Sequence, residues 1–385
     1  MSGFSFLHCS DLHIGRRLYG FSLLPDQRHV LAQIVELARA ERVDAVVIAG
    51  DFFDSPTPSA EAVAVADLFL SELTAVCPVL LTAGNHDSPE RLQFGSRLFA
   101  QAHLHIAALA QEKPLRVTFE DAYGPVVFDL LPFLRASAVR PFFPEDQLVT
   151  CQDAVAAVLA GTATDPATRR LLVAHQFIVG ADVRPAESES EMRFVGGSGE
   201  IDAGLFQDYI YVALGHLHGQ QSIGATHIRY SGSPLPYSFS EINHTKGALL
   251  VTLDGAGVRS IERKSLQPLR AMTEMSGLFA DVLHEGERLR MLGDTKADAY
   301  TRVILDDDVI PPDATNRLRG FLPYLVTVER RRRQADINRT YVAALPNHDP
   351  LAQFADFYRE QTGGELSLQQ VTWLTEAMSR ARQPE

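Results

Sequence analysis

The sequence predicts an α/β protein whose first part is built on a mostly parallel sheet. Three apolar runs typical of buried strands, 4–9, 43–48 and 78–82, alternate with two helical patterns at 26–42 and 59–75. This β-α-β-α-β order favours parallel strands. Each strand run also ends in a short polar segment, at the edge where open α/β sheets place their ligand sites.

The individual elements follow from local patterns. Leu31, Ile34, Val35 and Ala38 form the apolar stripe of the first helix. Pro89 stands where a further helix begins its first turn after residue 88. Beyond it the sequence predicts a hairpin at 117–132, a helix at 152–160 and a strand at 171–174. An exposed acidic loop follows at 183–199, then a strand at 209–214, a turn-rich loop at 231–236 and a strand at 247–253.

Composition describes an ordinary globular chain. Its 385 residues are 46% hydrophobic and 22% charged, enough for two or three domains with a substantial core. No apolar run approaches the roughly 18 residues of a membrane span, and no leader pattern precedes the first strand. Three scattered cysteines do not make a disulfide framework, so we expect a cytoplasmic protein with no membrane partner.

The net charge of −13 argues against a broadly basic nucleic-acid surface. It does not exclude a nucleic-acid substrate, because bound cations supply local positive charge that a residue count omits.

Side chains able to bind metals follow the predicted strand ends. Asp11 and His13 are two residues apart, so in an extended segment both side chains point the same way. The full set of candidate ligands is Asp11, His13, Asp51, Asn85, His175, His216 and His218. Each motif alone has a structural explanation, such as a turn at 84–87, but their convergence at strand ends favours a functional site.

The residue types indicate the chemistry. Without thiolates, the set suits Mn, Fe, Zn or Mg rather than a structural zinc site, and Cys9 is expected in the core or pointing outward. Seven ligands exceed the needs of one tetrahedral ion, whereas two ions sharing a carboxylate would use them all. That arrangement suits in-line displacement at phosphorus. His86, next to Asn85, is left to donate a proton to the leaving oxygen.

The remaining histidines have no such context. We expect them to be surface or core residues: His8, His29, His103, His105, His227, His244, His284 and His348.

The ordered motifs resemble the calcineurin-like metallophosphoesterase superfamily. They are Asp11-x-His13, Gly50-Asp51-x-x-Asp54, Gly84-Asn85-His86-Asp87, His175 and Gly215-His216-x-His218. The segments 8–15, 230–239 and 354–358 are similar to the bacterial SbcD branch, which is related to archaeal and eukaryotic double-strand-break repair nucleases.

The resemblance implies a fold and a domain plan. The fold would be a metallophosphoesterase β-sandwich flanked by helices, with a small α/β capping domain and C-terminal helices. The nuclease domain would occupy 1–265, the DNA-contacting cap 266–335, and a linker with partner-docking helices 336–385.

The resemblance also implies roles for the candidate ligands. One ion would bind Asp11, His13, Asp51 and His218; the other would bind Asp51, Asn85, His175 and His216. The family prefers manganese, although these ligand types alone do not separate Mn from Fe or Zn. His86 would be the acid–base residue. Archaeal relatives carry a second histidine where this chain has Asp54, which would instead orient or charge-stabilise His86.

Contacts with DNA are predicted at two places. Arg16 and Arg17 directly follow the first metal motif and are well placed to contact phosphate. The segment 268–333 reads as strand, helix, strand, helix, strand and is similar to the family's cap. Its eleven basic and eleven acidic residues give no electrostatic support for DNA binding. The basic run 330–333 would contact a DNA backbone or be a solvated end.

The C-terminal segment carries two short amphipathic patterns. They begin near residues 350 and 367 and are either packed on the main body or offered to another chain. The resemblance implies the second, with docking on the coiled-coil base of an SbcC-type ABC ATPase. The predicted partner contacts are Phe354, Phe357, Tyr358 and Trp373, of which Trp373 would be a natural anchor.

By this resemblance the chain is a two-metal DNA phosphodiesterase of repair and recombination, the nuclease subunit of an SbcC–SbcD-like complex. Its activities would be 3′-to-5′ exonuclease on duplex ends and endonuclease on single strands and hairpins. A homodimer formed by helices of the first 110 residues would sit within a heterotetramer. Two alternatives are a phosphodiesterase for cyclic nucleotides or other small esters, and a non-catalytic scaffold that binds DNA ends.

Overall fold

The computed structural model describes residues 3–162, 168–180, 183–191 and 199–331 and, nearer the C-terminus, 351, 354–355, 358–359 and 365–381. The chain divides into two compact units, Met1–Glu329 and Arg330–Glu385.

The first unit contains a six-stranded sheet in the order β16-β15-β1-β4-β5-β6. β1, β4, β5 and β6 run parallel, as the β-α-β-α-β pattern predicts, while β15 pairs antiparallel with β1 and β16 with β15. The strand bounds are Ser5–Cys9 (β1), Ala45–Ala49 (β4), Val79–Thr82 (β5), Leu104–Ala107 (β6), Gly247–Asp254 (β15) and Gly257–Ser265 (β16).

A second six-stranded sheet has the order β13-β14-β12-β9-β8-β7. The predicted hairpin forms its β7–β8 edge, and β8, β9, β12 and β14 run parallel. The bounds are Leu115–Asp121 (β7), Gly124–Leu131 (β8), Arg169–His175 (β9), Tyr211–Gly215 (β12), Gln221–Ile223 (β13) and Ala225–Tyr230 (β14).

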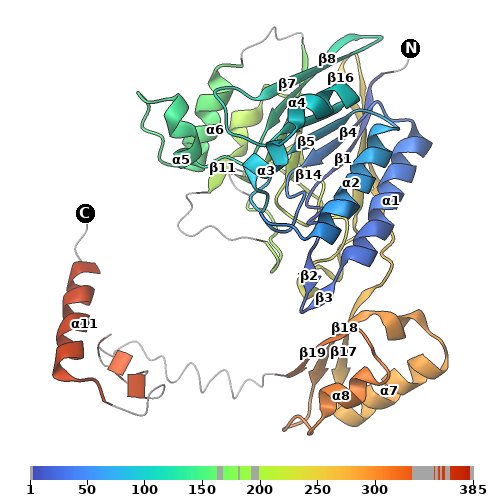
Figure 1. Cartoon of the computed structure of the whole chain (residues 1–385), viewed down its shortest axis with the longest axis vertical. Coiled ribbons are helices and arrows are strands. Elements are labelled where there is room, and N and C mark those ends of the chain that lie inside the picture. Colours follow the sequence, from blue (N-terminus) through green and yellow to red (C-terminus); the bar gives the residue numbers. More distant parts are fainter. Residues whose placement is uncertain are drawn as a thin grey trace. The chain divides into compact units, whose positions relative to one another are not determined.

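The two sheets pack face to face. Phe6 and Val47 of the first sheet share one buried cluster with Phe128, Val173 and Tyr211 of the second. Alternation along each strand directs every second side chain into this layer, so the remaining side chains face outward to the helices. The β-sandwich flanked by helices is therefore confirmed (Figure 1).

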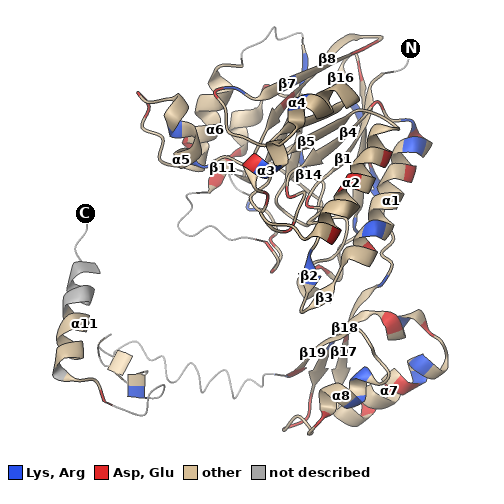
Figure 2. Ribbon diagram, in the orientation of Figure 1, with Lys and Arg blue, Asp and Glu red and all other residues tan. Residues whose placement is uncertain are grey.

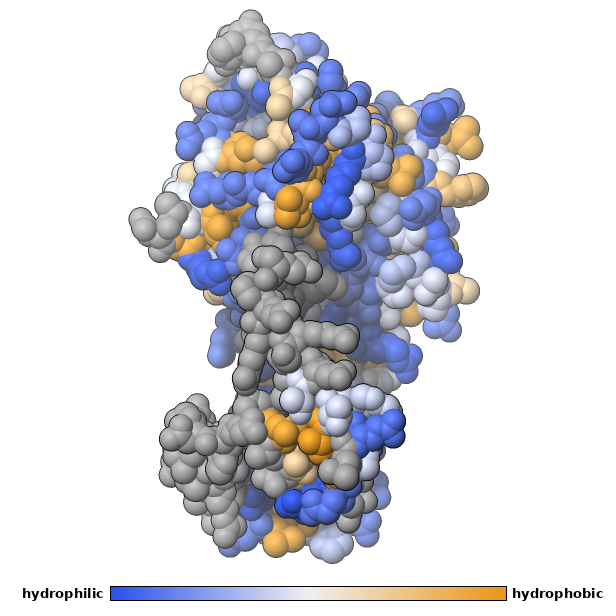
Figure 3. Space-filling model, turned by 90° about the vertical axis from the view of Figure 1, so that its left-hand side faces the viewer, coloured by the Kyte–Doolittle hydropathy of each residue, from blue (hydrophilic) through white to orange (hydrophobic). Residues whose placement is uncertain are grey.

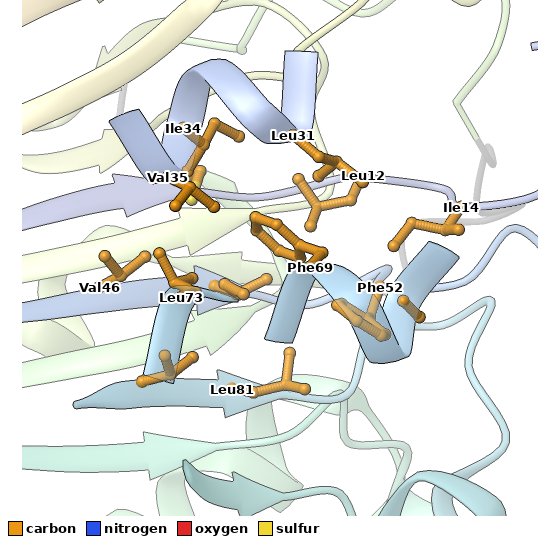
Figure 4. Close-up of a cluster of buried hydrophobic side chains, with 14 of the residues drawn as sticks. Leu12, Ile14, Leu31, Ile34, Val35, Val46, Phe52, Phe69, Leu73 and Leu81 are labelled. Atoms are coloured by element: carbon orange, nitrogen blue, oxygen red, sulfur yellow. The ribbon is translucent and has the colours of Figure 1, made fainter. Parts of the chain in front are cut away.

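Helices cover the outer faces. α1 (Leu24–Glu41) and α2 (Ala60–Thr74) bury Ile34, Phe69 and Leu73 against the first sheet (Figure 4). Ser59 caps α2 by accepting a hydrogen bond from the Ala62 amide. α5 (Ala136–Val139) and α6 (Cys151–Ala160) cover the second sheet. The helices α1, α2 and α6 begin and end within two residues of their predicted bounds.

Short elements complete this region. They are β2 (Arg17–Leu18), β3 (Phe21–Ser22), α3 (Pro89–Gln93), α4 (Ser96–Phe99), β10 (Phe177–Val179) and β11 (Glu200–Asp202). Single 3₁₀ turns lie at Ala100–Ala102, Arg140–Phe142, Ala203–Phe206, Phe239–Glu241 and Thr295–Asp298.

After β16 the chain forms a small three-stranded sheet, β17-β18-β19, with two helices. The bounds are Met272–Gly277 (β17), Phe279–Met291 (α7), Tyr300–Leu305 (β18), Ala314–Arg319 (α8) and Leu325–Arg330 (β19). The predicted strand–helix order is present. α7 carries both acidic and basic residues, whereas α8 carries Arg317 and Arg319 and no acidic residue (Figure 2).

This small sheet shares a buried cluster with the sandwich region. Met272, Tyr300 and Val326 pack with Leu23 and Tyr237. Asp26 of α1 adds polar contacts, because its Oδ2 accepts hydrogen bonds of 2.9 Å from both Arg270 and the Tyr300 hydroxyl. The small sheet is thereby fixed to the start of α1.

Several smaller expectations can be compared with the structure. Cys9, Cys77 and Cys151 are buried free thiols, and His8 is a fully buried core residue. The loop predicted as exposed at 183–199 is described at 183–191 and 199, and this part is not fully exposed, because Ser188 is only 3% exposed and Ser190 and Glu191 contact His218. On the face drawn in Figure 3, hydrophobic residues form small groups among hydrophilic ones. Among the described residues, no helix is long and apolar enough to cross a membrane.

In the second unit, α11 spans Leu368–Ala381, at the second amphipathic pattern. Trp373 is 60% exposed and Phe354 is 38% exposed, and Tyr358 is half-buried. Phe357 and the segment 334–347 lie outside the described residues.

Candidate metal centre

Five strands of the two sheets deliver the candidate ligands to one place. Asp11 follows β1, Asp51 follows β4 and Asn85 follows β5, whereas His175 ends β9 and His216 directly follows β12. The carboxyl ends of strands from the two sheets meet here, since the Asp11 carboxylate accepts a hydrogen bond of 3.0 Å from the His216 amide.

The side chains form two groups. In the first, ligand atoms of Asp11, His13 and His218 lie within 4.8 Å of one another, and the Nε2 atoms of His13 and His218 are 3.2 Å apart. In the second, Asn85 Oδ1 lies 3.1 Å from His175 Nε2 and 3.0 Å from His216 Nδ1.

Asp51 lies between the two groups. Its Oδ2 is 3.6 Å from His13 Nε2 and 3.4 Å from His175 Nε2, while its Oδ1 accepts a hydrogen bond of 2.8 Å from the His86 amide. One carboxylate oxygen therefore faces one imidazole of each group. A ligand shared by two ions would need such a position.

The backbone at these loops differs from expectation. Asp11, His13, Asp51 and His216 have φ values of 53°, 43°, 49° and 106°, in the region that L-residues seldom adopt. Asp11 and His13 thus converge through left-handed turns, and the expectation of an extended Asp-x-His segment was wrong. The His13 amide donates to the Asp51 carbonyl at 2.9 Å, which ties the two loops together. Such conformations cost about 1–3 kcal/mol each and persist only where the surroundings impose them.

Three glycines make the close approach of these loops possible. A Cβ at Gly84 would lie 2.1 Å from Asp51 Oδ1, and one at Gly50 would lie 2.3 Å from His175 Nδ1. A Cβ at Gly215 would lie 1.8 Å from the Ala49 carbonyl oxygen. No other residue type fits these positions without moving a candidate ligand.

Asp87 ties the β4 and β5 loops together from behind. Its buried carboxylate accepts hydrogen bonds from the amides of Phe52 (3.1 Å), Phe53 (2.8 Å) and Gly84 (2.9 Å). Asp87 is part of the Gly84-Asn85-His86-Asp87 motif, but the sequence did not predict this role. Through these hydrogen bonds Asp87 orients the loops that carry Asp51 and Asn85.

Burial and charge set the protonation of the site. Burial lowers the pKa of His216 to about 3 and the pKa of His218 to about 4, which keeps both imidazoles neutral. Burial acts to lower the pKa of His175 as well, but the Asp51 carboxylate raises it to about 9. Burial raises the pKa of Asp11 to about 7. For Asp51, burial opposes ionisation, yet His175 and His13 hold its pKa well below the usual range.

His86 stands beside the first group, with its ring centroid 4.8 Å from that of His13. Its Nδ1 lies 3.0 Å from the backbone carbonyl of Asp54, so the Asp54 backbone orients the ring. The Asp54 carboxylate is directed elsewhere, 3.4 Å from His13 Nδ1 and 2.8 Å from Arg16.

Of the two arginines expected at phosphate, Arg16 is mostly buried, paired with Asp54 and stacked 5.1 Å over the Tyr237 ring. Arg17 is exposed on β2, and its guanidinium donates to the Gly20 carbonyl.

Sequence reasoning missed a set of polar residues behind His218. They are Ser190, Glu191, Ser233, Glu241 and Lys246. Only the presence of a glutamate and a lysine next to the 231–236 turn signalled them, and no spacing rule connects those residues to a metal site.

The donor set fits divalent cations. Four imidazoles, two carboxylates and one amide oxygen converge at short distances, which suits metals that accept nitrogen and oxygen ligands. The Nε2 atoms of His13 and His218 are close to each other, and Asp51 Oδ2 lies nearby. A cation bound among these atoms would accept all of them as ligands.

Comparison with known proteins agrees with this geometry. Residues 4–149 match the model of the calcineurin-like phosphoesterases, and residues 266–362 match that of the type 5 capsule protein repressor C-terminal domain, which marks SbcD proteins. A protein of Staphylococcus saprophyticus, named as the SbcD component of the nuclease SbcCD, is 34% identical over 284 residues, covering 72% of this chain and 73% of its own length. The chain belongs to the SbcD family.

Another member of the SbcD family extends the match. The protein of the same name from Staphylococcus epidermidis is 29% identical over 367 residues, or 94% of both chains. A solved dimetal phosphatase from Danio rerio covers 69% of this SbcD-family chain with 14% identity and a TM-score of 0.39, and 100% of its own chain is covered.

Proposed function

We propose that this SbcD-family chain is a two-metal phosphodiesterase that cleaves DNA as the nuclease subunit of an SbcC–SbcD-like complex. The observation that carries this proposal is the placement of Asp51 Oδ2 between His13 and His175, 3.6 and 3.4 Å away. A phosphodiester needs charge stabilisation on both its attacking and leaving oxygens, and a shared carboxylate between two ligand groups serves that need.

Asp11, His13, Asp51 and His218 would hold one ion, and Asp51, Asn85, His175 and His216 the other. The bound pair supplies Lewis-acid stabilisation of the phosphoryl oxygens. We expect manganese, in keeping with the family resemblance. The nitrogen and oxygen ligands support a divalent ion without selecting it from iron or zinc.

His86 would provide the proton for the leaving oxygen. Its Nδ1 is engaged with the Asp54 carbonyl at 3.0 Å, which leaves Nε2 as the nitrogen that exchanges a proton with the substrate. Asp54 acts on this reaction through its backbone, and through its carboxylate it holds Arg16 next to His13. Arg16 would then lie close to a bound phosphate.

The substrate would be DNA, with 3′-to-5′ exonuclease action on duplex ends and endonuclease action on single strands and hairpins. The two relatives are both named as nuclease components, which supports this interpretation. Residues 1–265 would form the nuclease domain and 266–335 the cap that presents DNA. The segment 336–385 would dock an SbcC-type ATPase in the cytoplasm, and the 60% exposure of Trp373 suits an anchor for that contact.

A homodimer would form through the helices near residues 60–100. Three large apolar side chains are exposed there, Phe94 (81%), Leu98 (70%) and Phe99 (42%). An exposed apolar group of this kind marks an interaction surface. The Phe94→Asp variant should sediment as a monomer in the absence of SbcC, whereas wild type and the control Tyr123→Asp, at the turn of the β7–β8 hairpin, should sediment as dimers. A wild-type monomer at micromolar concentration would contradict the dimer.

The function is tested by incubating the purified chain and Mn²⁺ with end-labelled linear duplex DNA and, separately, with a small chromogenic phosphodiester. Each reaction is run with and without an SbcC-type partner. Degradation of DNA that the partner strengthens would support the proposal. Turnover of the small ester with DNA left intact under all conditions would instead indicate a small-substrate phosphodiesterase. Absence of Mn²⁺ binding at saturation would indicate a scaffold.

A further inference from the structure

A buried charged pair lies behind His218, and the chemistry proposed above does not use it. Glu241 is fully buried and Lys246 is 7% exposed. Lys246 Nζ donates to Glu241 Oε2 at 2.5 Å, to Ser233 Oγ at 2.8 Å and to the His218 carbonyl at 2.9 Å. Removing two charges from water is unfavourable, and a buried ion pair is often no more stabilising than hydrophobic residues of similar volume.

The hydrogen bonds around Glu241 have a defined direction. Ser190 Oγ lies 2.5 Å from Glu241 Oε1 and 2.8 Å from His218 Nδ1. A carboxylate paired with Lys246 only accepts hydrogen bonds, so the Ser190 hydroxyl donates its proton to Glu241. Its oxygen then accepts from His218, which places the imidazole proton on Nδ1 and leaves the Nε2 lone pair free.

His218 is also held at its backbone. Its amide donates to Glu191 Oε1 at 2.6 Å, and its carbonyl accepts from Lys246. The ring, the amide and the carbonyl are therefore each fixed by a charged residue or by its serine relay. His175 differs, because its Nδ1 lies 2.9 Å from a neutral group, the Ala49 carbonyl oxygen.

We propose that Glu241 is a positioning residue that acts through Ser190 to fix the proton of His218 on Nδ1 and aim Nε2 at the metal. Lys246 keeps Glu241 ionised and so fixes the direction of the relay. Outer groups of this kind orient metal-binding histidines and raise their basicity. The inference rests on the proposed role of His218 as a metal ligand.

Glu241→Gln reverses the relay. Lys246 still requires an acceptor, so the new amide turns its oxygen to Lys246 and its NH₂ group to Ser190. Ser190 then accepts from the amide and donates to His218 Nδ1, which moves the imidazole proton to Nε2, the nitrogen meant for the metal. Ser190→Ala instead leaves the Glu241 carboxylate 3.4 Å from Nδ1, so the original tautomer is retained.

The experiment measures the tautomer in metal-free full-length protein labelled with ¹⁵N-histidine. The His218 signal is assigned by its loss in His218→Gln. In the wild type and in Ser190→Ala the proton should be on Nδ1, and in Glu241→Gln it should be on Nε2. Titration with Mn²⁺ should show roughly 10- to 100-fold weaker binding at one of two sites in Glu241→Gln.

Asp121→Asn is the matched control, because Asp121 is also a buried carboxylate paired with a cation, Arg169, and contacts none of the seven candidate ligands. It should change neither the tautomer nor Mn²⁺ binding. If the tautomer is unchanged in Glu241→Gln, the inference about Glu241 is wrong, but the proposed metal site is not affected. If His218→Gln binds Mn²⁺ as the wild type does, the proposed metal site itself is wrong.

Discussion

Replacing Asp26 should loosen the small β17–β19 sheet from the sandwich without touching the metal centre. Asp26 is 1% exposed, and its Oδ2 accepts from both Arg270 and Tyr300. Asp26→Ala removes the hydrogen-bond acceptor of the buried Tyr300 hydroxyl and the negative charge that pairs with the Arg270 guanidinium. Breaking a fully buried pair costs about 3–5 kcal/mol, and the Arg270 side chain is 21% exposed, so we expect the lower limit, about 3 kcal/mol.

Urea denaturation followed by far-ultraviolet circular dichroism measures this change in the free energy of unfolding. Asp26→Asn retains an acceptor oxygen and should cost about 1 kcal/mol. Glu274→Ala is the control, because Glu274 pairs with Arg302 on a solvent-exposed strand and such pairs contribute less than about 1 kcal/mol.

The same variant separates two activities. If the β17–β19 region presents DNA, Asp26→Ala should lose duplex cleavage while it keeps Mn²⁺ binding and turnover of a small phosphodiester. Equal loss of both activities, or a stability equal to that of Glu274→Ala, would refute the reasoning.

Three further predictions concern other parts of the chain. His86→Ala should keep its bound Mn²⁺, measured by elemental analysis, and lose cleavage, whereas Asp51→Ala should lose both; wild-type turnover in His86→Ala would contradict the acid–base role. Burial lowers the pKa of His8 to about 3, below the unfolded value of 6.5, so its contribution to stability is complete above pH 6.5 and is lost as the pH falls. Between pH 7 and pH 5 the wild type should therefore lose about 2 kcal/mol more than His8→Phe in urea titrations, and parallel curves would rule this out. Trp373→Ala should weaken binding to an SbcC-type partner in a pull-down titration at least tenfold and leave cleavage of a small ester unchanged, while Gln369→Ala on the same helix should bind normally.

Local patterns in the sequence predict much of the sandwich, and they single out side chains that the structure brings to one place. The strand ends can be predicted because apolar runs stop abruptly close to Asp11, Asp51 and Asn85. The pairing of β15 with β1 cannot be predicted in this way. It joins residues about 245 positions apart, Ser5 with Thr252 for example, and no local signal specifies that partner.

The backbone and the outer hydrogen bonds were also out of reach of sequence reasoning. Left-handed turns at Asp11 and His13 depend on contacts with the β4 loop, which only the folded chain supplies. Glu241 lies 23 residues from His218 and reaches it through Ser190, in a loop expected to be exposed. Side chains that act through a third residue leave no regular spacing to detect.

The crowding at Gly50, Gly84 and Gly215 has a consequence for interpreting related sequences. A chain could retain all seven candidate ligands and still be inactive, because one added methyl group at any of these glycines would push a ligand out of place. A sequence comparison that considers only the acidic and histidine ligands would then classify an inactive homologue as an active enzyme. The space beside the ligands carries as much information about activity as the ligands do.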